Sequence, residues 1–263
     1  MRIIFLILIV NFAIIGCRNK SEYHKNGKVY KEYYDVGARK LLGVREYDTL
    51  GSLVSTYFKN QAGEYDSIKT DYSDGVARCK TEYSFGKERV KDFFYKTGAL
   101  KEHRILKRDG KIWNSVFYDE LGEIERTMNY INRYGKPYIN QVISFNRKGL
   151  IDLNNTKYFD VIINEDTITK DDKITFKILR LCGNDVLLSG LICDFDGEHR
   201  ITDSSRIKYF DVFEETKVSP RKLHNDTLRV IIKLKRFGLD GTKDSSRSFT
   251  TSTYIEKPFF VKD

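Results

Sequence analysis

The chain has 263 residues, enough for one or two domains of ordinary size. Apolar residues make up 40%, charged residues 32%, and the mean hydropathy is −0.48. These values exclude a protein with many membrane spans, and the apolar share excludes a chain that is disordered throughout. Proline is scarce at 3 residues, whereas Tyr and Phe supply 17 each, which favours strands over helices.

The N-terminal segment has the pattern of an export signal. Arg2 precedes an apolar run from Ile3 to Ile15, which is interrupted only by Asn11. As a helix this run would rise only about 20 Å, well short of the roughly 30 Å hydrocarbon core of a bilayer. Polar and charged residues follow at once. We therefore expect residues 1–16 to be a cleaved signal peptide rather than a membrane span.

The end of that run, Ile14-Ile15-Gly16-Cys17, resembles the bacterial lipobox. The resemblance implies that the Cys17 thiol takes a diacylglyceryl group, that cleavage falls between Gly16 and Cys17, and that the new amine is acylated with a chain such as palmitate. Such chains hold a protein on a membrane. The resemblance thus predicts a lipoprotein of the bacterial cell envelope, and Arg18 in place of Asp after the cysteine favours the outer membrane. The alternative is a buried cysteine in an ordinary apolar segment.

Regularly spaced glycines occupy the first half of the chain. They recur at intervals close to twelve residues, commonly with an aromatic residue three to five positions before the glycine and often with an aliphatic residue two positions after it. Twelve residues accommodate a short strand and a tight turn, and glycine supplies the positive φ that hairpin turns need. We therefore expect an antiparallel meander over residues 22–152. The glycines are residues 27, 37, 51, 63, 75, 86, 98, 110, 122, 135 and 149.

One phrase of this pattern occurs twice. Tyr47-Asp-Thr-Leu-Gly51-Ser-Leu53 returns as Tyr118-Asp-Glu-Leu-Gly122-Glu-Ile124. Together with Tyr95-Lys-Thr-Gly98-Ala-Leu100 and Lys107-Arg-Asp-Gly110-Lys111, it resembles the MORN-type repeats of bacterial YwqK-like proteins. Members of that family are commonly called antitoxins, a role that implies a cytoplasmic partner, and the export signal argues against transferring it to this chain.

The glycine spacing stops near Thr156, where runs of alternating apolar residues begin. Six or seven strands separated by polar turns fit an immunoglobulin-like β-sandwich. We therefore expect an all-β protein with a MORN-like β-repeat domain at 17–155 and an immunoglobulin-like domain at 156–263. Of the cysteines that follow Cys17, we expect Cys182 and Cys193 to flank a hairpin turn at residues 183–185, a geometry that disfavours a disulfide between them and leaves the fate of Cys79 open.

Charge is unevenly distributed between the two parts. The chain carries 46 Lys and Arg against 37 Asp and Glu, a net charge of +9, and nearly all of the excess lies before Thr156. One interpretation is a basic, Tyr-rich surface that binds an envelope protein or an anionic glycolipid. The other is a solvated sheet whose lysines prevent edge-to-edge aggregation. No nucleic-acid-reading motif is present, and we expect no nucleic acid partner.

The sequence contains no motif of a known catalytic or metal site. Its four histidines are widely separated, and no spacing of His, Cys or carboxylates fits a metal site. We therefore expect no catalytic residue, no metal and no cofactor. The favoured function is non-catalytic binding or scaffolding at the envelope, and the oligomeric state stays open. The alternative is an envelope hydrolase acting on glycans, with carboxylates that converge from separate strands.

Overall fold

The computed structural model describes residues 20–36, 41–165, 167–182, 186–197, 199–202, 208–210, 212, 214–220, 224–236 and 249–262. Within these ranges the protein is all-β, as the sequence predicts, and contains no helix. It follows that no helix in this part of the chain is long and apolar enough to cross a bilayer. The described chain divides into two compact units. Unit 1 comprises residues up to Gly110 with Glu120–Gly122, and unit 2 comprises Lys111–Asp119 and the residues from Glu123 onward.

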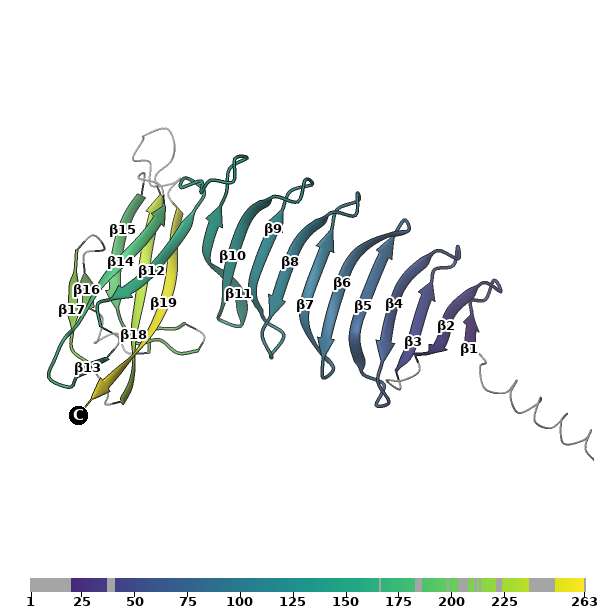
Figure 1. Ribbon diagram of the computed structural model, residues 1–263, viewed down its shortest axis with the longest axis horizontal. Helices are drawn as coiled ribbons and strands as arrows, with labels where there is room; N and C mark the ends of the chain where they lie inside the picture. The colour runs from purple at the N-terminus through teal and green to yellow at the C-terminus, as the bar shows by residue number, and fades with distance from the viewer. Residues whose placement is uncertain are drawn as a thin grey trace, which may run out of the picture. The chain divides into compact units, whose positions relative to one another are not determined.

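Unit 1 contains an antiparallel meander in which each strand pairs with the next in sequence (Figure 1). This arrangement confirms the expected succession of short strands joined by tight turns. Neighbouring strands in a meander are local in sequence, so the glycine spacing alone is enough to predict them. The strands are β1 (Lys20–Tyr23), β2 (Val29–Asp35), β3 (Leu42–Tyr47), β4 (Leu53–Lys59), β5 (Tyr65–Ser73), β6 (Val76–Ser84), β7 (Lys87–Phe94) and β8 (Leu100–Leu106).

The turn after β3 shows why the glycine, aromatic and aliphatic residues recur together. Gly51 has φ of 90°, a left-handed conformation in which a β-carbon would be strained. The aromatic Tyr47 lies directly opposite the aliphatic Leu53 across the hairpin, and Asp48 accepts backbone hydrogen bonds inside the turn. The spacing in the sequence is therefore the spacing of the cross-strand pair that closes this hairpin. The same opposition joins Tyr23 to Val29, Phe94 to Leu100, Tyr118 to Ile124 and Phe145 to Ile151.

Unit 2 contains two groups of paired strands. One follows the order β9-β10-β11-β12-β14-β17, and the other is a five-stranded sheet in the order β13-β19-β18-β15-β16. The domain boundary expected between residues 155 and 156 falls inside this unit. Its strands are β9 (Ile112–Tyr118), β10 (Ile124–Arg133), β11 (Lys136–Ser144), β12 (Lys157–Ile163), β13 (Thr167–Thr169), β14 (Ile174–Cys182), β15 (Val186–Ile192), β16 (Lys208–Phe210), β17 (Thr216–Val218), β18 (His224–Arg236) and β19 (Phe249–Lys262).

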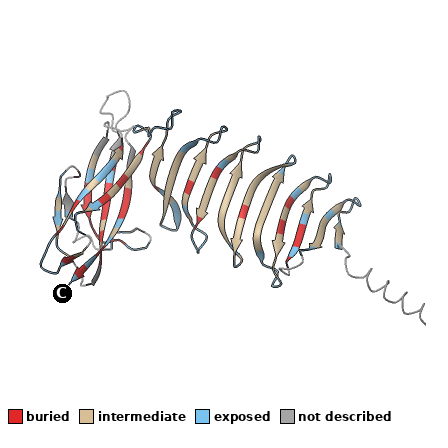
Figure 2. Ribbon diagram, viewed as in Figure 1, coloured by how far each residue is buried: buried red, intermediate tan, exposed pale blue. Residues whose placement is uncertain are grey.

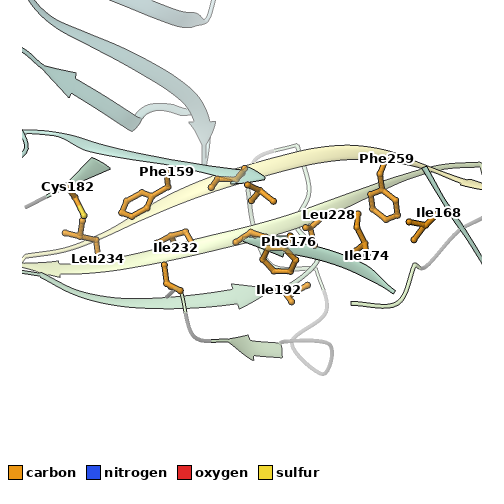
Figure 3. Packing of buried hydrophobic residues seen from close by; sticks show 14 of the residues in the cluster. Phe159, Ile168, Ile174, Phe176, Cys182, Ile192, Leu228, Ile232, Leu234 and Phe259 are labelled. Atoms are coloured by element: carbon orange, nitrogen blue, oxygen red, sulfur yellow. The ribbon is translucent and has the colours of Figure 1, made fainter. Parts of the chain in front are cut away.

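A core of aliphatic and aromatic side chains fills the space between β12 and β14 on one side and the five-stranded sheet on the other (Figure 3). These side chains point into the core because every second residue of a strand points to the same face of its sheet. Phe159 and Val161 of β12 and Phe176 of β14 are fully buried, and they meet Val230 and Ile232 of β18. Burial of apolar surface is therefore the main stabilising contribution in this part of unit 2.

The prediction of a hairpin between β14 and β15 is wrong. These strands belong to different sheets, because β14 pairs with β12 and β17 whereas β15 pairs with β16 and β18. Apolar residues of both strands, such as Phe176 of β14 and Ile192 of β15, contribute to the same core from opposite sides, and an apolar run does not identify the pairing partner. The turn residues 183–185 lie outside the described residues. Among the described cysteines no disulfide is formed, and Cys182 and Cys193 are buried in different apolar clusters.

Candidate functional surface on the repeat strands

One face of unit 1 gathers tyrosine and charged side chains. Residues directly opposite one another in antiparallel strands point to the same side of the sheet, so the register defines rows of neighbours. We call this surface the tyrosine face. Its first row is Tyr33, Val44, Tyr57, Lys69, Thr81, Lys91 and Arg104, and its second row is Glu22, Lys31, Glu46, Ser55, Asp71, Cys79, Phe93 and Glu102.

Three tyrosines of this face, Tyr57, Tyr65 and Tyr83, lie close to one another, and a fourth lies close to a lysine. The rings of Tyr57 and Tyr65 are 5.2 Å apart at their centroids in an edge-on arrangement, and Tyr65 stacks on Tyr83 at 5.1 Å. The Lys59 ammonium lies 5.8 Å from the Tyr57 ring and 5.7 Å from the Tyr65 ring. At these distances the cation is attracted to the electron-rich ring faces. The fourth, Tyr33, lies 5.8 Å below the Lys20 ammonium.

A carboxylate organises the middle of the tyrosine face. Glu46 accepts hydrogen bonds from Tyr57 at 2.9 Å and from Ser55 at 3.0 Å, and it pairs with Lys31 at 2.9 Å. Burial acts to raise the pKa of the Glu46 carboxyl, but these partners outweigh it and hold the pKa below its ordinary value. The bond from Glu46 in turn raises the pKa of Lys31. The carboxylate is therefore ionised at neutral pH and locks the surrounding side chains in place.

Most basic groups of the tyrosine face have an acidic partner. Arg104 donates two hydrogen bonds to Glu102, at 2.8 and 3.0 Å, while its guanidinium lies over the Phe93 ring at 4.7 Å. Lys69 forms an ion pair with Asp71 at 3.0 Å. Charge on this surface is thus largely balanced, and the lysines without an acidic partner among the described residues stand out. These are Lys20 and Lys59, both of which lie over tyrosine rings.

The opposite face of the same strands is polar as well. Lys80 pairs with Glu82 at 3.1 Å, and His103 with Asp92 at 2.7 Å. Buried side chains of unit 1 such as Val44, at 0% exposure, lie instead on the tyrosine face. The tyrosine face therefore contains the more deeply buried side chains of the two surfaces.

The residues that the lipobox resemblance singles out, Gly16 and Cys17, lie outside the described residues. Cys79 lies in the second row of the tyrosine face, where its thiol is 3.8 Å from the Thr81 hydroxyl. Burial raises the pKa of this thiol, which disfavours the thiolate that nucleophilic chemistry would need. Cys79 thus has the environment of a structural residue.

The sequence did not predict which tyrosines and lysines share a face. Every paired couple of neighbouring strands in unit 1 except β2–β3 contains an irregularity in its register, as between Glu46 and Tyr47, and such a bulge shifts all later residues relative to a simple alternation. The signal that was present is the recurrence of Tyr, Lys and Glu at alternate positions of several strands.

Within the described ranges, no group of three or more His, Cys, Asp and Glu residues could hold a metal ion. No known family model matches the chain, and no curated protein matches it either.

Proposed function

We propose that the protein is a lipid-anchored cell-envelope protein with a non-catalytic binding or scaffold role, exercised through the tyrosine face of its repeat strands. The observation that carries this proposal is the gathering of Tyr33, Tyr57, Tyr65 and Tyr83 with Lys20 and Lys59 on one ordered surface. Tyrosine supplies a large contact area with little loss of conformational entropy on binding. Lysines that lie over its rings can reach an anionic group of the partner.

Two features of the chain support the remaining parts of the proposal. The lipobox-like Ile14-Ile15-Gly16-Cys17 supports a lipid anchor at Cys17. We assign this anchor to the outer membrane of the cell envelope. The Tyr–Gly–aliphatic turns support a MORN-like repeat array. In residues 156–262, two packed sheets support an immunoglobulin-like sandwich, which we assign to a stalk or a second contact.

The partner that fits the tyrosine face is an envelope protein or an anionic glycolipid such as lipopolysaccharide. An anionic group placed near Lys20 or Lys59 would gain about 1 kcal/mol from each charge. Because the other basic groups described on this face are engaged by carboxylates, the attraction is confined to these two positions. Binding would therefore be selective for the geometry of the anionic groups rather than for net charge alone.

The anchor is tested by growing cells that express the full chain with radiolabelled palmitate. Wild type should incorporate the label and sediment with the membrane fraction, because the Cys17 thiol and amine carry acyl chains. Cys17→Ser should lose the label entirely, whereas Cys79→Ser, a matched loss of one thiol, should keep it. Label that persists in Cys17→Ser would refute the anchor.

The surface is tested by measuring lipopolysaccharide binding to the full chain in nanodiscs of neutral lipid. Changing both Lys20 and Lys59 to Ala should weaken binding about tenfold or more, given about 1 kcal/mol for each charge. A control with Lys80→Ala and Lys96→Ala removes the same charge from the opposite face and a turn, and it should bind like wild type. Equal losses in the two double variants would show that only net charge matters and would exclude the tyrosine face.

A further inference from the structure

A pocket lies in unit 2 where β11 and β12 diverge. These two strands share a single pair of opposed residues, Val142 and Lys157, so the space beyond it is not closed by a ladder of hydrogen bonds. The pocket has a volume of about 600 Å³, within the range of small-molecule sites. Its lining is mainly apolar and consists of Pro137, Tyr138, Ile139, Val142, Asn155, Thr156, Lys157, Leu234 and Thr251.

Lys157 occupies a position that faces the core. It precedes Phe159 and Val161 at alternate positions of β12, and both of these residues are fully buried in the aliphatic core. Leu234, another member of that core, lines the pocket beside it. Alternation would ordinarily place an apolar residue at position 157, so an ammonium there is a departure of the kind found at functional sites.

The Lys157 ammonium makes few contacts with the rest of the protein. It donates one hydrogen bond, to the carbonyl oxygen of Ile139 at 3.2 Å, and it lies 5.5 Å from the Tyr138 ring. Among the described residues no carboxylate pairs with it. Burial lowers the pKa of Lys157 to about 8, which means that the protein holds a partly desolvated cation without a counter-charge. An ammonium has three N–H donors, so two can still serve a ligand.

We propose that this pocket binds an amphipathic monocarboxylate, with the apolar chain against Ile139, Val142 and Leu234 and the carboxylate on the Lys157 ammonium. An apolar lining with one cation matches a ligand that has an apolar body and one anionic end. The carboxylate would supply the missing counter-charge, and a charge-assisted hydrogen bond in a partly dry site is among the stronger polar contacts. This site is independent of the tyrosine face and of the Cys17 anchor.

Equilibrium dialysis of the full chain in neutral nanodiscs, with empty nanodiscs subtracted, tests the proposal with decanoate and decanol as probes. Wild type should bind decanoate about tenfold or more tightly than decanol, because only the carboxylate forms the charged hydrogen bond. Lys157→Met keeps an unbranched apolar side chain and should lose that preference, while its affinity for decanol changes less than twofold. Lys148→Met, which removes an exposed charge from a turn of the same unit, should bind both probes like wild type.

Three outcomes would overturn the proposal. They are undetectable decanoate binding to wild type, equal wild-type affinity for the two probes, and a decanoate affinity that Lys157→Met leaves unchanged. The comparison of the two probes on wild type needs no variant, so the proposal stays falsifiable even where Lys157→Met changes the fold.

Discussion

Unit 1 and the two-sheet core of unit 2 differ in how far their residues are buried (Figure 2). In the core of unit 2 most of the fully buried residues are apolar, as Phe159, Phe176 and Ile232 illustrate, with Thr253 as a polar exception. The strands of unit 1 are mostly half-buried, and their few buried positions include the polar Thr81 and Glu102. Two packed sheets exclude water from the faces between them, whereas a single layer of strands leaves both faces partly wet.

The comparison shows that regular backbone pairing can be stabilised in two ways. In unit 2, apolar area removed from water contributes most. On the tyrosine face, ordered pairs such as Glu46 with Tyr57 and Arg104 with Glu102 take the place of a second layer. Each cross-strand pair contributes only about 0.2 to 1 kcal/mol, so stability there is spread over many positions. A surface stabilised in this way remains accessible to a partner, which suits a binding face.

Truncation of a buried aromatic residue should reveal the largest difference between the regions. Phe176→Ala removes a fully buried ring from the core of unit 2 and should lower the free energy of unfolding by about 3 to 5 kcal/mol. The matched variant Phe93→Ala removes a half-buried ring from the tyrosine face, where Arg104 covers it. There we expect a loss of about 1 to 2 kcal/mol, because less apolar area returns to water.

Both losses are measured by chemical denaturation of the full chain, monitored by far-ultraviolet circular dichroism. The test is the ratio of the two losses in the free energy of unfolding, since both variants remove the same kind of side chain. Equal losses for Phe93→Ala and Phe176→Ala would contradict the distinction between a single-layer surface and a packed core.

The meander strands of unit 1 were predictable because their determinants are local. A glycine such as Gly51, with Tyr47 four residues before it and Leu53 two after it, specifies a hairpin without reference to distant parts of the chain. The crossing from β14 to β15 was not predictable in this way. Both strands contribute apolar residues to the same core, and only long-range packing decides that they lie in different sheets.

The two surfaces of functional interest depend on the same long-range information. The tyrosine face requires the register of each hairpin, which bulges such as the one after Glu46 modify. Lys157 directly precedes the apolar alternation of β12, so in the sequence it is typical of the polar residue that begins a strand. Only the tertiary structure shows that this lysine faces the core and a pocket.

A smaller change in the free energy of unfolding is expected on removal of the Lys157 charge at that pocket. This change is a gain in stability, whereas the two phenylalanine variants lose stability. In the folded protein the pKa of Lys157 is about 8, below its usual value of 10.5, so the folded state disfavours the ammonium relative to the unfolded chain. Lys157→Met should therefore raise the free energy of unfolding at pH 7. We expect a gain of about 1 to 2 kcal/mol, because a half-buried ammonium retains part of its hydration.

The pH dependence separates this explanation from a simple gain in packing. Between pH 8 and 10.5 the unfolded chain binds more protons at Lys157 than the folded chain does, so wild type gains stability as pH rises through this window. The advantage of Lys157→Met should thus be complete below pH 8 and should shrink toward pH 10.5. The titratable groups that face Lys157, Tyr138 and Cys182, are present in both proteins and cancel in the difference.

Denaturation curves of wild type and Lys157→Met at pH 7 and pH 10 provide the measurement, with Lys148→Met as the exposed control that should match wild type at both values. If Lys157→Met raised the free energy of unfolding by the same amount at pH 7 and pH 10, methionine would merely pack better. The folded state would then not destabilise the charged form of Lys157. A gain confined to the lower pH would show that the fold retains this cation at a cost in stability. The core residues around it have no such cost, so this result would distinguish Lys157 from its neighbours as a residue kept for binding rather than for folding.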